Sequence, residues 1–249
     1  MPDSTQQNSQ TDKVQIVFWD ERDRSPEALE LQVVDRIGPE LLPACDRLTA
    51  LVHDVQAAKV RCPAPPRRGE SRPAGMLDLW PTSNEVTDLA LARLREAGFR
   101  PAAWRVEETV YTQYGDNRWG KKRDWPDGAR SPGVVLLTLM ERPRRLSKDE
   151  WLRRWYGRQS PVSEQMQPRA RYVRNLVLDA ITPDAPPVEG IVEEAWPDGR
   201  HVENPFLFYG ARNPVELVIN QAKMMASVLS FLNILKLRTQ MVGEYFLKS

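Results

Sequence analysis

The chain has 249 residues, and its 35 lysines and arginines against 34 aspartates and glutamates give a formal net charge of +1. This near-neutral balance argues against a general nucleic-acid coat and against an acidic tail protein. The two cysteines, Cys45 and Cys62, make neither a disulfide scaffold nor a four-ligand zinc site by themselves. The sequence contains no apolar run of about 18 residues and no signal-peptide core, so we expect a cytoplasmic protein without nucleic-acid or membrane partners.

The predicted elements of the first half follow the order β-α-β-β-α-β. Strands are predicted where β-branched and aromatic residues gather, and helices where apolar residues recur at helical spacing behind a capping residue such as Ser25. A disordered tail at 1–13 precedes strand 14–19, a helix from 25, strands 48–55 and 75–80, helix 86–97 and strand 104–111. The proline-rich stretch 62–73 is predicted to be a loop.

Residues 114–132, rich in glycine, proline and basic side chains, are predicted to be a linker loop. The same element order then returns. Ser147 and Glu150 form a capping box at the start of a helix, and Asn213 caps another before Pro214. The expected segments are strand 134–141, a helix from 147, strands 172–178 and 188–196, helix 214–235 and strand 241–247.

The two halves also share short stretches of sequence. Residues 78–81 (DLWP) match 194–197 (EAWP), and residues 106–108 (VEE) match 242–244 (VGE). Two βαββαβ units form two ferredoxin-like sheets, and each sheet can cover the open face of the other. The sequence therefore predicts an α+β fold with tandem ferredoxin-like repeats at 14–113 and 133–249, packed as a single-chain pseudo-dimeric α+β barrel.

Several segments of the second half resemble EthD-type domains. The stretch 140–151 resembles the end of the family's first strand and the helix start after it, 155–161 its aromatic segment, 171–175 its second strand, and 190–196 its third. The resemblance covers about 133–249, and repeat 14–113 is a degenerate copy by comparison. It implies the dimeric α+β barrel superfamily, whose members include enzymes of aromatic or polyketide-like substrates that need neither metal nor organic cofactor, and haem-binding branches. No cofactor is therefore expected here.

One residue departs from the family pattern: Gln159 stands where the family has histidine. Glutamine donates and accepts hydrogen bonds but takes no proton near neutral pH. If the family's acid–base chemistry needs that histidine, the second half has lost it.

Three polar residues are the candidates for catalysis: Tyr172, Glu194 and His53. A tyrosine hydroxyl polarises a carbonyl or holds an enolate, whereas the alternative for Tyr172 is a core aromatic. A buried carboxylate is a candidate base, whereas the alternative for Glu193 or Glu194 is an ion pair with a strand arginine. His53, predicted within strand 48–55, is either a general base or a surface histidine. His201 lacks companions for a metal site.

Seven further residues are expected to bind a ligand. Eight tryptophans suit a roomy apolar pocket for a flat molecule, or equally a barrel core. The aromatic stretch 205–210 is read as a lid or an oligomer contact. The predicted ligand-binding residues are Trp155, Gln159, Asn175, Trp196, Trp80, Phe208 and Tyr209. Because three residues separate Tyr172 from Asn175, these two are expected on opposite faces of their strand.

The basic residues between 142 and 158 are either a site for an anionic carrier or a solvated helix face. We expect a metal-independent lyase or isomerase, such as a dehydratase or aldol-type enzyme, that acts on a hydrophobic aromatic, polyketide-like or polycyclic substrate in catabolism or biosynthesis. The alternative is a non-catalytic binding or assembly protein that uses the duplicated barrel. Two copies of the chain are expected to associate as a homodimer.

Overall fold

The computed structural model describes residues 13–249. The predicted disordered tail therefore lies outside the described residues, except for its last member. Lys13 is the first residue of strand β1 and is 3% exposed, so the tail boundary was one residue too long. Within 13–249 no helix is long and apolar enough to cross a membrane.

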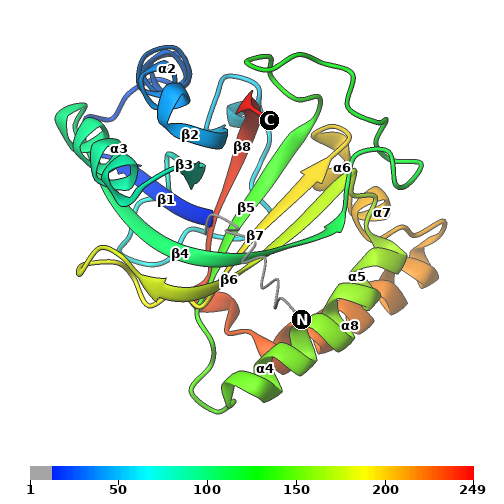
Figure 1. Ribbon diagram of the computed structural model, residues 1–249. Helices are drawn as coiled ribbons and strands as arrows, with labels where there is room; N and C mark the ends of the chain where they lie inside the picture. The colour runs from blue at the N-terminus through cyan, green and yellow to red at the C-terminus, as the bar shows by residue number, and fades with distance from the viewer. Residues whose placement is uncertain (1–12) are drawn as a thin grey trace, which may run out of the picture.

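Eight antiparallel strands in this part of the chain close into a barrel (Figure 1). Their order around the wall is β1-β3-β2-β8-β5-β7-β6-β4. The strands are β1 (Lys13–Asp20), β2 (Cys45–Val52), β3 (Gly75–Pro81), β4 (Phe99–Thr112), β5 (Val134–Met140), β6 (Arg171–Ala180), β7 (Gly190–Trp196) and β8 (Arg238–Lys248). The first four strands are neighbours in one half of the wall and the last four in the other, and the halves join where β2 pairs with β8 and β4 with β6.

Helices cover the outer side of both halves of the barrel wall (Figure 1). On the first half lie α1 (Pro26–Glu30), η1 (Leu31–Ile37), α2 (Gly38–Leu41), η2 (Leu42–Ala44) and α3 (Asn84–Glu96). On the second lie α4 (Lys148–Arg154), η4 (Trp155–Gln159), α5 (Ser160–Met166) and α8 (Pro214–Phe231). The shorter elements η3 (Ala57–Lys59), α6 (Arg200–Glu203), α7 (Pro205–Phe208) and η5 (Ile234–Lys236) belong to connections.

The helix starts lie where the capping residues place them. Ser25 Oγ accepts a hydrogen bond from the amide of Ala28, Ser147 Oγ from that of Glu150, and Asn213 Oδ1 from that of Glu216. Each bond satisfies one of the amides that a helix leaves open at its first turn. The capping residues therefore predicted correctly where α1, α4 and α8 begin.

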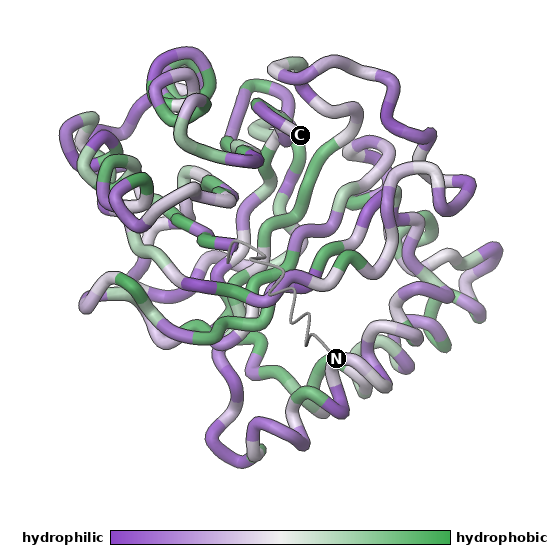
Figure 2. Tube along the Cα trace, in the orientation of Figure 1, coloured by the Kyte–Doolittle hydropathy of each residue, from purple (hydrophilic) through white to green (hydrophobic). Residues whose placement is uncertain are grey.

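The barrel interior is filled by side chains and is not an open pore. Val17, Trp19, Leu51, Trp104 and Leu137 belong to one buried apolar cluster inside the wall. Separate clusters hold the two helical layers to the outside of the wall. Figure 2 shows β5 as an almost continuously apolar strand, whereas the loop between β4 and β5 is largely hydrophilic. Strand β5 is apolar at every position except Thr138 because both of its faces are covered.

One of the sequence echoes holds in the structure and the other is out of register by one residue. Val106 pairs with Lys13 of β1, and Val242 pairs with Val135 of β5, so 106–108 and 242–244 occupy equivalent places. In β3, however, Asp78 belongs to the barrel interior, whereas Glu194 of β7 faces the helices. The residue equivalent to Asp78 is Glu193, three positions after the first residue of β7 as Asp78 is in β3.

Several element boundaries differ from the prediction. Strand β2 ends at Val52, so His53 lies just outside the strand in which it was expected. Strand β4 begins at Phe99, because residues 99–103 pair with β1 although Pro101 interrupts the strand pattern. Helix α8 ends at Phe231, before Leu232, where the backbone is extended. The stretch 197–212, between the predicted strand 188–196 and the predicted helix 214–235, contains α6 and α7.

Candidate functional site

A cleft of about 240 Å³ lies between the outer face of the second half of the wall and its helices. Its floor is formed by side chains of β5, β6, β7 and β8, and its roof by η4, α8 and the end of α7. Apolar residues dominate the lining, which is typical of small-molecule sites; among them are Leu136, Met140, Val192, Met224, Val228, Phe231 and Leu237. Six of the ten residues predicted for the site line this cleft: Trp155, Gln159, Tyr172, Glu194, Phe208 and Tyr209.

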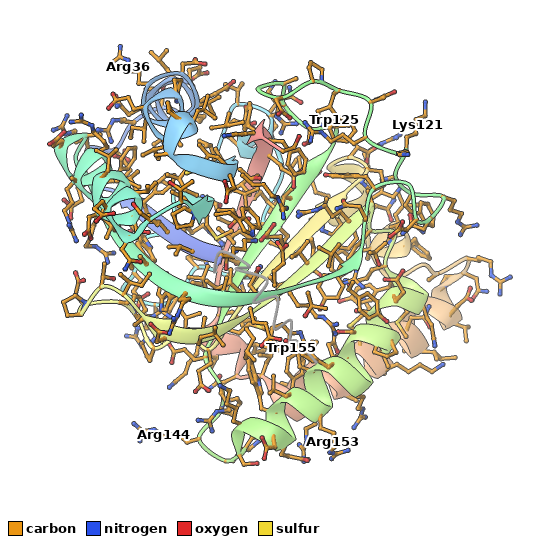
Figure 3. All side chains as sticks on the ribbon, viewed as in Figure 1. Arg36, Lys121, Trp125, Arg144, Arg153 and Trp155 are labelled. Carbon is orange, nitrogen blue, oxygen red and sulfur yellow. The ribbon has the colours of Figure 1, made fainter. Side chains whose placement is uncertain are left out.

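Tyr172 supplies a hydroxyl to the floor of the cleft. Trp155 Nε1 donates a hydrogen bond to Tyr172 Oη over 3.3 Å, and Ser160 Oγ lies 3.4 Å from the same oxygen. Figure 3 shows Trp155 on the inner side of its helix, between the helix and the wall. Burial raises the pKa of the Tyr172 hydroxyl, although the Arg169 guanidinium opposes the shift. Tyr172 therefore keeps its proton at ordinary pH and is a neutral hydrogen-bond donor.

Glu194 lies opposite Tyr172 in the register of β6 and β7. Arg169 Nη1 donates to Glu194 Oε1 over 2.6 Å, and the Arg169 guanidinium lies 4.0 Å from the centre of the Tyr172 ring. Among the described residues, Glu194 Oε2 has no hydrogen-bond partner. One carboxylate oxygen is thus fixed by the arginine, and the other is left for the cleft.

Gln159 leaves a buried polar atom without a partner. Its Nε2 donates to the sulfur of Met224 over 3.3 Å, whereas Oε1 is buried and accepts no hydrogen bond from any described residue. An unpaired buried acceptor costs about 1–3 kcal/mol. A ligand hydroxyl or amide in the cleft would remove that cost.

The segment predicted as a lid forms part of the roof. Phe208 stacks on Trp196 with ring centres 5.0 Å apart and an interplanar angle of 15°, and the ring of Tyr209 meets that of Phe208 edge-on. Phe208 and Tyr209 line the cleft, whereas Phe206 and Leu207 are exposed. Trp196 itself is fully buried and does not line the cleft, so the structure places it behind Phe208.

The remaining predicted site residues lie elsewhere. Asn175 is inside the barrel, on the opposite face of β6 from Tyr172, as the spacing of three residues requires. Trp80, 9% exposed, carries the Arg47 guanidinium 3.8 Å from its ring centre. His53 lies beside a different cavity, and its Nδ1 is 2.8 Å from the carbonyl of Met241. His201 bonds Asp198 and contacts the Trp119 ring.

A cluster of buried charges inside the barrel was not foreseen. Lys13 Nζ lies 2.9 Å from Asp78, 2.8 Å from Glu108 and 3.3 Å from Glu193. Arg171 Nη1 bridges Glu193 and Glu244 at 3.0 and 2.9 Å. The expected ion pair between a β7 glutamate and Arg171 is therefore present, and it belongs to Glu193. No group of three metal-ligating side chains occurs among the described residues.

One sequence signal pointed to a residue that was missed. Asp78 is a single acid in an otherwise apolar strand, GMLDLWP, and such a residue must find a buried partner. Arg169 gave no such signal, because an arginine just before a strand is ordinarily expected to be exposed. In the structure it is 1% exposed. The apolar roof from α8 was visible only as helical periodicity, which does not reveal what the helix covers.

The basic residues between 142 and 158 form a solvated surface. Arg153 and Arg154 pair with Glu150, and Arg142 pairs with Glu189. Figure 3 shows Arg144 and Arg153 pointing away from the wall. The structure therefore favours the reading of this run as a solvated helix face over an anion site.

No family model matches the chain, and no curated protein matches it. Among solved structures, an anthrone oxidase-like protein is similar with a TM-score of 0.58 and 10% sequence identity, over 97% of this chain and 95% of that one. A variant of chlorite dismutase from Candidatus Nitrospira defluvii aligns with a TM-score of 0.44 and 8% identity, over 96% of this chain and 93% of that one. The chain therefore shares its fold with the anthrone oxidase-like protein.

Proposed function

We propose that the cleft binds a hydrophobic aromatic, polyketide-like or polycyclic small molecule. The observation that carries this proposal is the unpaired, buried Oε1 of Gln159 in an otherwise apolar lining. A protein built only for stability would fill such a space with apolar side chains, because a buried acceptor without a donor is destabilising. A flat ligand with a hydroxyl group, which can donate a hydrogen bond to Gln159 Oε1, satisfies both the apolar lining and this acceptor.

We further propose that the protein is a cofactor-independent lyase or isomerase that works through an enolate. Glu194 Oε2 removes a proton from the carbon beside a substrate carbonyl, and the electron pair of that C–H bond moves onto the carbonyl oxygen. The hydroxyl of Tyr172 donates a hydrogen bond to this oxygen, which stabilises the negative charge as it develops. Return of the proton to another carbon completes an isomerisation, and loss of a β-hydroxyl as water completes a dehydration.

The alternative is a non-catalytic binding protein, and two observations favour it. Gln159 replaces the histidine of the EthD pattern, and Arg169 holds one oxygen of Glu194 in a 2.6 Å hydrogen bond. Only the other oxygen of this carboxylate is then left to reach a substrate. Binding of the ligand is common to both proposals, and only proton transfer separates them.

We infer that the two halves are tandem ferredoxin-like repeats at 14–113 and 133–249, the second EthD-like, joined by the loop at 114–132. The equivalent registers of Val106 with Lys13 and of Val242 with Val135 support this. The association of two chains, the cytoplasmic location and the lack of nucleic-acid partners stay predictions. The cofactor-free proposal is tested by the absorption spectrum of the purified protein, because a Soret band would contradict it.

The ligand proposal is tested by titrating the protein with naphthalene-bearing alcohols and with anthrone while following tryptophan fluorescence. Saturable quenching is expected, because Trp155 lines the cleft. The variant Met224→Trp fills the cleft and should abolish binding, whereas Arg158→Gln, an exposed change on η4, serves as the control. Binding that survives Met224→Trp would place the ligand elsewhere.

Proton abstraction is tested by deuterium exchange at the carbon beside the carbonyl of bound ketones in heavy water, followed by NMR. The wild type should accelerate exchange. Glu194→Gln should slow it by about 10²–10⁴, and Tyr172→Phe by about 10²–10³. Tyr156→Phe, a half-buried tyrosine of η4 that does not line the cleft, is the control. Equally fast exchange in all variants would remove Glu194 and Tyr172 from the mechanism, and exchange no faster with the wild type than without protein would leave the binding protein as the function.

A further inference from the structure

A larger cavity, of about 910 Å³, adjoins the cleft and has a more polar lining. It is lined by the crossing loop between β2 and β3, by α6 and by the start of β8. Pro63 and Ala64 line both this cavity and the cleft, so the two spaces meet at that point of the loop. We call the larger space the loop cavity, with His53, Arg61, Cys62, Arg72, Glu203 and Gln240 as its polar lining.

The loop cavity exists because β2 stops pairing with β8 before β8 ends. The two strands pair from Leu48 to Val52, but β8 runs on toward Arg238 without β2 beside it. Side chains of the loop take the place of the missing strand: His53 Nδ1 bonds the carbonyl of Met241 over 2.8 Å, and Arg72 Nη1 bonds that of Thr239 over 2.6 Å. These contacts fix both side chains at the wall of the cavity.

Arg72 is a half-buried cation whose hydrogen bonds go to neutral acceptors. Besides the carbonyl of Thr239, it donates to Thr239 Oγ1, to the sulfur of Cys62 and to the carbonyl of Ala64. Across residues 13–249 it has no carboxylate partner, and its Nε has no hydrogen-bond acceptor. A partly desolvated guanidinium without a counter-ion is costly, and because Nη1 and Nη2 already bond neutral acceptors, Nε is the donor left for an anionic group.

The other ionisable groups leave the cavity with an excess of positive charge. Arg61 is exposed, and Glu203 is the single carboxylate among the lining residues; its Oε1 accepts a hydrogen bond from the backbone amide of Arg61. Because a carbonyl only accepts, the Nδ1 of His53 carries the hydrogen in its bond to Met241. Its Nε2, which has no partner among the described residues, is left for the cavity.

We propose that the loop cavity is an anion site, and that the ligand of this protein is a hydrophobic carboxylate whose apolar body lies in the cleft and whose carboxylate reaches Arg72. The path runs past Pro63 and Ala64, and Arg72 also holds Thr239, which lines the cleft. This inference rests on the proposed ligand-binding function and adds the class of the ligand.

The test compares naphthalene carboxylates that have side chains of increasing length with the primary alcohols of the same lengths, by fluorescence titration. Binding of the alcohols reports the cleft alone, and the ratio of the two affinities reports the loop cavity. In the wild type the best carboxylate should bind about tenfold more tightly than its alcohol, as expected of charge-assisted hydrogen bonds. The advantage should shrink as salt is added, and inorganic phosphate should compete with the carboxylate but not with the alcohol.

Variants separate the cation from the fold of the loop. Arg72→Gln should remove the carboxylate advantage and leave the alcohol affinity unchanged, and Arg72→Lys should keep part of the advantage. Arg68→Gln, an exposed change in the same loop, is the matched control. If Arg72→Gln fails to fold, Arg72→Lys and the salt dependence of the wild type still decide the outcome. Alcohols that bind as tightly as carboxylates would overturn the anion site, whereas failure of every alcohol to bind would overturn the proposed function instead.

Discussion

Lys13 Nζ lies 2.9 Å from Asp78 Oδ2 inside the barrel, and both side chains are 2% exposed. The lysine also reaches Glu108, Glu193 and the amide oxygen of Asn175. Gln15 Nε2 bonds both Asp78 and Glu193, at 2.8 and 3.0 Å. One ammonium group thus joins strands of both halves of the wall, and it does so where the sequence suggested only the end of a tail.

We expect Lys13→Met to destabilise the protein by about 3–5 kcal/mol, the usual cost of removing one partner from a buried ion pair. The variant leaves Asp78 and Glu193 together without the cation between them. The free energy of unfolding from urea titration measures the effect. Lys121→Met, an exposed lysine that points away from the wall (Figure 3), is the control and should change it by less than about 0.5 kcal/mol.

The added change Asp78→Asn should recover part of the loss in Lys13→Met, because it removes one of the unpaired carboxylates. The difference between the double variant and the sum of the two single variants gives the coupling energy. Strict additivity would show that the lysine and the aspartate do not stabilise each other, and would refute the arrangement described for the cluster.

Stability is predicted to fall as the pH rises from about 4 to about 7. Burial and the neighbouring Glu193 carboxylate raise the pKa of Asp78 to about 7, against the attraction of Lys13. Folded Asp78 therefore holds a proton that the unfolded chain has lost, and the stabilisation that is present below pH 4 disappears as the pH passes through 7. Glu193 has the opposite effect on stability. Lys13 and Arg171 lower its pKa to about 2 despite burial, so its ionised form stabilises the protein at neutral pH, and this stabilisation is lost only in acid.

The groups that face Asp78 are Lys13, Gln15 and Glu193, and Glu108 faces the same lysine. The slope expected from one proton is at most about 1.4 kcal/mol per pH unit. Asp78→Asn, which mimics the protonated acid, should flatten the curve of unfolding free energy between pH 5 and 7 in urea titrations at each pH. An unchanged slope in this variant would assign the pH dependence to another group.

Most of the secondary structure could be predicted from local features of the sequence. The capping residues Ser25, Ser147 and Asn213 and the period of the apolar residues fixed the helices and strands, because these depend on neighbours in the chain. The order of the elements then led to two sheets, and the structure closes them into one barrel. The match of 78–81 with 194–197 was wrong by one residue: Asp78 is equivalent to Glu193, not to Glu194. A shift of one position turns a strand residue to the other face of the sheet.

Only some of the residues of the candidate site could be predicted from the sequence. Tyr172, Glu194, Trp155 and Gln159 gather in one cleft because strand alternation and helix periodicity put them on facing surfaces. His53 was misplaced because β2 ends at Val52, three residues before the predicted end of the strand at 55. The contact of Arg72 with Thr239 joins residues 167 positions apart in the chain. No local pattern encodes such a contact, which depends on how the two halves meet.

Two glycines with positive φ provide a matched test of the wall near the cleft. A Cβ on Gly133, at φ +79°, would lie 1.9 Å from the carbonyl oxygen of Trp196, whereas a Cβ on Gly128, at φ +82°, would meet nothing within 4 Å. Gly128→Ala should cost only the strain of a left-handed residue, about 1–2 kcal/mol. Gly133→Ala should cost roughly 3–5 kcal/mol, because backbone must also move. Equal losses in urea titrations would show that the approach to Trp196 is not close.

The stack of Phe208 on Trp196 makes a prediction about ligand exchange. Phe208 lines the cleft from above and is fixed by a buried ring behind it. We expect Phe208→Ala to open the roof and to raise the dissociation rate of the naphthalene alcohols by about tenfold, which equals about 1.4 kcal/mol, with little change in association. Stopped-flow fluorescence measures both rates. Phe206→Ala, an exposed change in the same short helix, should leave them unchanged. A faster association with an unaltered dissociation rate would instead mean that Phe208 obstructs the way in and does not hold the ligand.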